Sequence, residues 1–169
     1  YQLYILFFIV FISCDDPAII NTSYVDSHII FTSRRWWNYD LFITDENGQK
    51  ITHLTKNKWL DFNPIVTSDG SNVAFISDRD GNREIYTFEL RWVDGHNQWQ
   101  THNLKNITKS PEHDWFPVFS PLDDKIVYGV YFAENDNYDI FQMEMDGSNK
   151  INLTNTPYYE KHPQFSPDG

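Results

Sequence analysis

The chain contains 169 residues, of which 40% are apolar and 17% aromatic, so it can bury a packed core as one domain or part of one. Its 13 Lys and Arg face 24 Asp and Glu, and the resulting net charge of −11 excludes nucleic acid as the main partner and a basic membrane-surface helix, since both depend on clustered cations. The single Cys excludes an intrachain disulfide and a Cys-based zinc site.

The first fourteen residues are predicted to be a targeting signal. Leu3 to Ile12 is an unbroken apolar run, too short at about 1.5 Å per residue to cross a hydrocarbon core of roughly 30 Å. It ends in Ser13-Cys14, and Asp15-Asp16-Pro17 follows, a pattern that resembles the lipobox of bacterial lipoproteins. The resemblance implies that Cys14 is lipidated and becomes the first mature residue. An ordinary secretory signal, or a hydrophobic strand with an incidental Cys, is the alternative.

After residues 15–26, a short linker that can include a first strand, the chain repeats. Four landmarks recur three times: an aromatic ending an apolar pair, an aromatic after an acidic residue, a Thr after Leu or Ile, and a Pro. The minimal unit is 44 residues long, and the second unit carries nine extra residues. The landmarks are Phe31, Phe42, Thr55 and Pro64; Phe75, Tyr86, Thr108 and Pro117; and Tyr128, Phe141, Thr154 and Pro163.

Each unit reads as four short strands. In the third unit we expect them at residues 117–120, 126–131, 139–145 and 151–153, separated by turn signals such as Asp146-Gly147-Ser148. Pro117 suits the first position of its strand, where no ladder donor is lost. No stretch shows a sustained period of 3.6 residues, so we expect almost no helix. The nine extra residues of the second unit, within Arg91 to Thr101, lengthen its last hairpin, either as a decoration or as a partner contact.

Four strands per 44 residues are typical of a β-propeller blade. Three sets of motifs resemble the WD40-like (PD40) repeats of TolB-type propellers: Ser-Pro-Asp-Gly-like turns, the hairpin Phe75 to Tyr86, and an acidic residue three positions before Pro. The resemblance implies an all-β fold of four-stranded antiparallel blades, with about three blades in residues 27–169 and the propeller incomplete. The turns are Ser166-Pro167-Asp168-Gly169, Thr67-Ser68-Asp69-Gly70 and Ser120-Pro121-Leu122-Asp123; the acidic segments are Asp61-Phe62-Asn63-Pro64, Asp114-Trp115-Phe116-Pro117 and Glu160-Lys161-His162-Pro163.

Loops at one end of the blades are predicted to hold the ligand face. In an antiparallel meander the loops between the second and third strands share an end with the loops that lead to the next blade. Exposed aromatic residues among polar groups there suit a sugar or a peptide, although packing between blades is the alternative. The residues are Trp36, Trp37, Tyr39, Trp59, Phe62, Trp115, Phe116, Tyr158 and Tyr159.

Three repeated carboxylates form a second candidate site. Asp61, Asp114 and Glu160 could make a ring that holds a cation if the propeller closes, but repetition in every unit favours carboxylates that accept hydrogen bonds in their own loops. Asp78-Arg79-Asp80-Gly81 resembles the start of a calcium loop without its remaining ligands. We therefore predict no metal and no cofactor. Neither a Gly-x-Ser-x-Gly nor a His-Glu-x-x-His motif occurs, so no catalytic residue is predicted.

The leading hypothesis is a lipid-anchored protein of the bacterial cell envelope, periplasmic or on the surface, whose propeller binds a protein or glycan. Its contact with the membrane would be the lipid anchor alone. Propellers with this repeat also precede serine peptidase domains of the prolyl oligopeptidase type and occur in metal-dependent sugar lyases, so both remain alternatives. A Gly-x-Ser-x-Gly segment beyond Gly169 in the gene would favour the peptidase.

Overall fold

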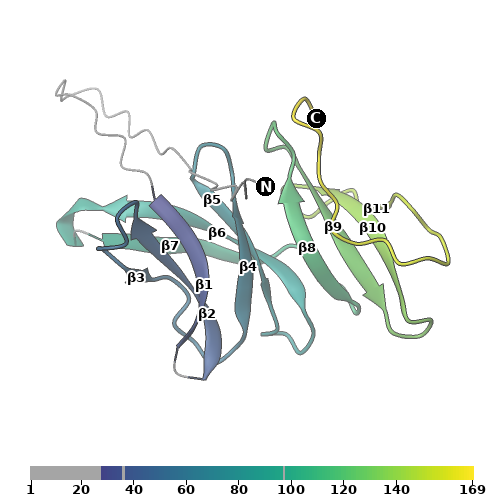
Figure 1. Cartoon of the computed structure of the whole chain (residues 1–169), viewed down its shortest axis with the longest axis horizontal. Helices are drawn as coiled ribbons and strands as arrows, with labels where there is room; N and C mark the ends of the chain where they lie inside the picture. The colour runs from purple at the N-terminus through teal and green to yellow at the C-terminus, as the bar shows by residue number, and fades with distance from the viewer. Residues whose placement is uncertain (1–27, 36, 97) are drawn as a thin grey trace, which may run out of the picture.

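The computed structural model describes residues 28–35, 37–96 and 98–169, and the predictions for Cys14, the linker and Trp36 lie outside them. These residues form three antiparallel sheets that stand side by side like neighbouring blades (Figure 1). The first sheet has the order β1 (His28–Arg35), β2 (Asn38–Asp45), β3 (Thr52–His53). The second comprises β4 (Asp61–Val66), β5 (Asn72–Ser77), β6 (Glu84–Val93) and β7 (Gln98–Asn106), and the third β8 (His113–Phe119), β9 (Lys125–Phe132), β10 (Asn137–Glu144) and β11 (Ile151–Asn152).

The predicted all-β fold with about three blades is therefore confirmed. The second and third sheets are four-stranded meanders, and the first has three strands within the described part of the chain. The described residues contain one 3₁₀ turn, Asp94–His96, and no α-helix. Accordingly, none of the helices in the described part could cross a bilayer.

The second blade is buried on both faces, which explains its unbroken apolar strands. Side chains alternate along a strand, so Val73 and Phe75 join one core while Ala74 joins the other. The first core also contains Leu41 and Ile43 of β2, whereas the second contains side chains of the third blade. Each core thus fills the space between two adjacent blades.

The inner strands differ from the sequence prediction. Strand β8 begins at His113 rather than at Pro117, and β4 likewise begins at Asp61, so the predicted loop residues Phe62, Trp115 and Phe116 lie within strands. Both strands continue past Pro64 and Pro117 because a β-bulge interrupts the pairing there, at a register shift between Phe62 and Ile65 and between Trp115 and Val118. The bulge removes the need for a ladder donor at Pro.

Hydrogen bonds to the repeated Thr stabilise the outer part of each blade. The hydroxyls of Thr55, Thr108 and Thr154 accept hydrogen bonds from backbone N–H groups of β2, β6 and β10, respectively, at 2.9–3.0 Å. The residue two positions before each Thr contacts the buried carboxyl group at the start of that strand. These pairs are His53 with Asp40, Asn106 with Glu84, and Asn152 with Asp139.

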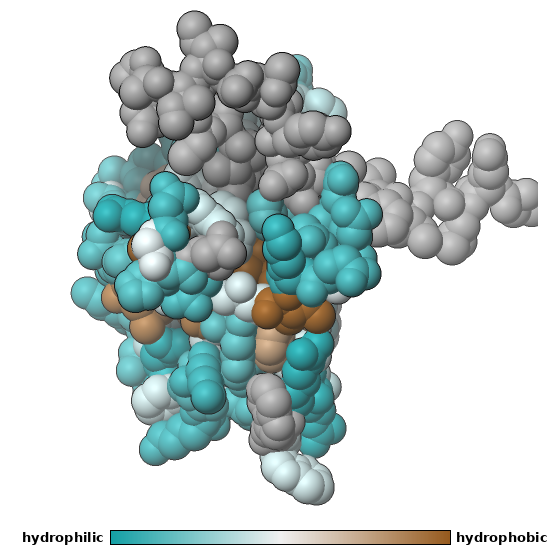
Figure 2. All heavy atoms as spheres, turned by 90° about the vertical axis from the view of Figure 1, so that its left-hand side faces the viewer, coloured by the Kyte–Doolittle hydropathy of each residue, from teal (hydrophilic) through white to brown (hydrophobic). Residues whose placement is uncertain are grey.

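The insertion in the second blade forms the long β6–β7 hairpin, as predicted, and it folds toward the first blade. Trp99 is 9% exposed and belongs to the core that contains Leu41 and Leu54. Its ring meets His28 edge-on, with 5.0 Å between the centroids. Viewed from the left of Figure 1, where the first blade and this hairpin lie, most of the described surface is hydrophilic and hydrophobic residues form only small patches (Figure 2).

Candidate binding site

A backbone distortion recurs directly before the Pro of each repeat, in β4, in β8 and in the segment after β11. Asn63, Phe116 and His162 have φ values of 52°, 54° and 56°. A left-handed conformation is uncommon for a residue with a side chain, and the following Pro already disfavours the right-handed helical region. In β4 and β8 this residue lies in a bulge, which redirects its side chain, and all three residues line the same cavity.

This cavity, which we call the inner-strand cavity, has a volume of about 650 Å³. Among the described residues, its lining includes no Asp, Glu, Lys or Arg. Besides the three left-handed residues, the apolar part of the walls comes mostly from β1, β4 and β8, with one residue each from β2 and β6: Ile29, Ile30, Ile43, Ile65, Val66, Leu90, Val118 and Phe119. Such a lining suits an uncharged, largely apolar occupant.

The predicted aromatic residues separate into two groups. Phe62, Trp115 and Phe116 are half-buried and form a chain of ring contacts that ends at His162, with centroid distances of 6.1, 5.7 and 4.0 Å. Trp59 is also half-buried, at 5.7 Å from the Arg79 guanidinium. The other group is exposed: Trp37 (92%), Tyr158 (72%), Tyr159 (54%) and Tyr39 (41%).

The exposed tyrosines of the third blade extend a polar cluster. The Tyr138 and Tyr159 rings lie 5.9 Å apart, and the Lys161 ammonium lies 4.0 Å above the Tyr138 ring. A hydrogen bond to Asp136 raises the pKa of Tyr159 to about 12, so this hydroxyl stays protonated. The cluster is therefore aromatic and neutral at its rings, with one charge of each sign at its edge.

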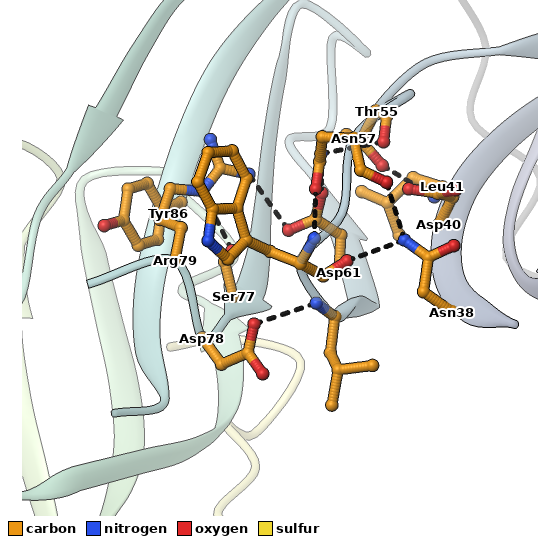
Figure 3. Close-up of polar contacts among 12 residues, drawn as sticks. Asn38, Asp40, Leu41, Thr55, Asn57, Asp61, Ser77, Asp78, Arg79 and Tyr86 are labelled. Atoms are coloured by element: carbon orange, nitrogen blue, oxygen red, sulfur yellow. Dashed lines mark hydrogen bonds and ion pairs between the residues drawn. The ribbon is translucent and has the colours of Figure 1, made fainter. Parts of the chain in front are cut away.

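Asp61 is held by its own surroundings. It is fully buried, and its carboxylate accepts hydrogen bonds from Arg79 Nη2 at 2.9 Å and from Asn57 Nδ2 at 2.6 Å (Figure 3). Arg79 Nε donates in turn to Ser77 Oγ at 2.9 Å, and the guanidinium lies 4.5 Å from the Tyr86 ring centroid. These contacts neutralise a charge that would otherwise be costly to bury.

The other two carboxylates have different partners. Glu160 accepts a hydrogen bond from the Thr156 hydroxyl in its own loop. Asp114 is fully buried, yet neither of its carboxylate oxygens accepts a hydrogen bond. Across residues 28–35, 37–96 and 98–169, no three His, Cys, Asp or Glu side chains come together as metal ligands, and the three predicted carboxylates make no such group.

Sequence reasoning missed a repeated Asn that positions the loops between blades. Asn38, Asn82 and Asn137 each stand two residues before the buried acidic residue of the third strand. Their amide nitrogens donate to carbonyl oxygens of the loop that leads to the next blade, at 2.8 Å to Asn57, 2.8 Å to Ser110 and 2.7 Å to Thr156. The spacing to the acidic residue was the available signal.

The repeats match the family described as the TolB beta propeller domain (PD40) over residues 23–169. The chain belongs to this family. It is 29% identical over 140 residues to the uncharacterized protein Atu1656 of Agrobacterium fabrum, covering 78% of this chain and 45% of the relative. It is 27% identical over 95 residues to the Tol-Pal system protein TolB of Desulfotalea psychrophila, covering 56% and 20%.

Solved structures show the same TolB-type fold. A structure assigned to TolB from Agrobacterium tumefaciens matches with a TM-score of 0.62 at 28% identity, over 75% of this chain and 44% of that one. TolB from Acinetobacter baumannii matches with a TM-score of 0.61 at 20% identity, over 77% and 30%. The chain thus spans less than half the length of these relatives. The predicted TolB-type propeller is confirmed.

Proposed function

We propose that this chain is part of a lipid-anchored cell-envelope propeller whose inner-strand cavity binds an extended segment of a protein partner. Family membership supports the class of protein, and the lipobox-like segment ending at Cys14 supports the anchor. The observation that carries the proposal is the combination of an uncharged cavity and a strand edge beside it.

The strand edge belongs to β1. In the described part of the chain, β1 is the terminal strand of its sheet, and His28, Ile29 and Ile30 all line the cavity. Because successive side chains point to opposite faces, three consecutive residues reach one cavity only along the strand's edge. An edge strand of this kind can pair with an extended peptide through main-chain hydrogen bonds, and the aliphatic walls would hold alternate side chains.

The partner can be tested by photo-crosslinking with the full-length protein in its own cells. A photoreactive amino acid at Phe116 faces the cavity, whereas one at Leu122, which is 80% exposed in a turn, is the matched control. We expect specific protein adducts from position 116 and not from position 122, and their loss in an Ile65→Asp variant that places a charge in the wall. Equal adducts from both positions, or adducts with polysaccharide alone, would contradict the proposal.

The lipid anchor has a separate test. Mass spectrometry of the mature N-terminus should find acyl groups on Cys14, and Cys14→Ala should release the protein from the membrane fraction. An unmodified Cys14 after signal removal would refute the anchor and leave the binding proposal intact.

A further inference from the structure

Asp114 lies at the junction between the second and third blades. Its backbone N–H donates to the carbonyl oxygen of Arg83 at 2.7 Å, immediately before β6 begins. The Arg83 N–H donates back to His113 Nδ1 at 3.1 Å. The Asp114 side chain is therefore buried where the inner strand of one blade is attached to its neighbour.

The surroundings of Asp114 lack the partners that its counterpart has in the second blade. Asp61 is paired with Ser77 in the ladder, and Asp114 in the same way with Val130. Two residues farther along, the second blade has Arg79, which binds Asp61, whereas the third blade has Phe132. The place of the amide donor Asn57 is taken by Ser110, whose oxygen accepts a hydrogen bond from Glu112 N–H at 3.1 Å.

Charged and titratable groups act on Asp114 from β6, β9, the loop before β8 and the β10–β11 turn. Burial is the largest cause that raises the pKa of Asp114, and Glu84 of β6 and Glu112 of the preceding loop raise it further. The Thr108 hydroxyl and Lys150 from the β10–β11 turn lower it. Tyr128 of β9 has its own pKa raised by burial and by Asp114. Together these groups bring the pKa of Asp114 to about 7.

We propose that Asp114 is a proton-operated contact between the second and third blades, closed when the carboxyl group is neutral and weakened when it ionises. An ionised carboxylate that has two acidic neighbours, opposed only by the Thr108 hydroxyl and Lys150, is costly inside a protein, and the nearest relief is separation of β8 from β6. Trp115 and Phe116 follow Asp114 directly, so the movement would reach the aromatic run beside the inner-strand cavity. The proposal does not depend on what that cavity binds.

The direction of the pH effect follows from linkage. In the unfolded chain Asp114 ionises near 3.8, while in the folded protein it holds its proton to about pH 7. Stability from this group is therefore complete below pH 4, declines as the pH rises from 4 to 7, and stays low above that. Unfolding of the full-length protein by urea at pH 4.5 and pH 8 measures this decline.

We expect the unfolding equilibrium constant of the wild type to rise roughly a hundredfold more than that of Asp114→Asn between these two pH values. Asp114→Asn should match the wild type at pH 4.5 and exceed its stability at pH 8. The control Asp61→Asn breaks the ion pair with Arg79 and should lose stability at both pH values. Equal pH slopes for the wild type and Asp114→Asn would overturn the proposal.

A direct titration keeps the test decisive if Asp114→Asn fails to fold. The ¹³C carboxyl resonance of Asp114 in the full-length wild type should titrate with a midpoint near 7, and Phe132→Arg should lower that midpoint. Hydrogen exchange of the Asp114 amide, corrected for its intrinsic pH dependence, should accelerate above the same pH. A wild-type midpoint near 4 would refute the proposal.

Discussion

The second and third blades bury the same carboxylate in two different states. Asp61 in β4 accepts hydrogen bonds from a guanidinium and an amide, whereas for Asp114 in β8 the position equivalent to Arg79 holds Phe132 and neither carboxylate oxygen has a partner at hydrogen-bond geometry. Both are fully buried, and both lie at the start of an inner strand that bulges before Pro. The repeat therefore fixes where the acidic group lies, whereas residues that differ between the repeats, such as Arg79 against Phe132 and Asn57 against Ser110, decide what surrounds it.

Removing Arg79 from the second blade should have the largest effect on stability. Arg79→Leu leaves Asp61 buried without a counterion, and we expect a loss of about 3–5 kcal/mol in the free energy of unfolding at pH 7. The matched control is Arg91→Leu, which removes a surface ion pair with Glu89 and should cost far less. Urea unfolding measures both losses, and similar values would show that the buried pair of Arg79 and Asp61 stabilises the fold no more than a surface pair does.

A second pair of equivalent positions sharpens the comparison in the hairpin turns. A Cβ at Gly147 would lie 2.2 Å from the Ile107 carbonyl oxygen, whereas a Cβ at Gly48 would meet nothing within 4 Å; both residues have positive φ. We expect Gly147→Ala to cost about 2–4 kcal/mol, from backbone strain and overpacking, and Gly48→Ala about 1 kcal/mol. Thermal unfolding gives the difference, and equal shifts would mean that the blades do not touch at Ile107.

Introducing a cation near Asp114 should make its surroundings more like those of Asp61 in the second blade. Phe132→Arg places a guanidinium where Arg79 stands relative to Asp61, at the cost of an aromatic contact with Phe141. We expect the change in the free energy of unfolding caused by Phe132→Arg to be about 1–2 kcal/mol more favourable at pH 8 than at pH 4.5, because only the ionised Asp114 attracts the guanidinium. A pH-independent effect would mean that the new side chain does not reach the carboxylate.

The smallest effect is expected at the outer strands, where every blade makes the same type of contact to its buried carboxyl group. His53 Nε2 lies 3.0 Å from Asp40, and the equivalent Asn152 donates to Asp139 at 2.7 Å. His53→Asn keeps the contact type while losing the stacking on Phe42, so the cost should stay below about 1 kcal/mol. His53→Leu, which removes the partner, should cost more, about 1–3 kcal/mol, and a reversed order would contradict the repeat alignment.

The sequence predicted the parts of the fold that depend on local pattern. The spacing of Thr55, Thr108 and Thr154 placed the outer hairpins correctly, because each hydroxyl serves the backbone of its own blade. The inner strands were predicted too short. Pro117 indicates an interrupted ladder, and nothing local tells that a bulge allows the strand to continue through it.

The site was less predictable because it depends on contacts between blades. The aromatic residues were predicted as one set, and only the fold separates Phe62, Trp115 and Phe116 from the exposed Trp37 and Tyr158. The replacement of Arg79 by Phe132 was visible in the aligned repeats, but its meaning required the ladder that places each two residues beyond the partner of a buried Asp.

The hairpin that carries Trp99 has a consequence for the order in which the molecule comes apart. In a linear array of repeats, cooperativity depends on the coupling between nearest neighbours. Trp99 adds a buried aromatic contact between the first two blades, while the ionised form of Asp114 weakens the contact between the second and third. The junction between the first two blades should therefore be the stronger of these two, and the difference should grow as the pH rises.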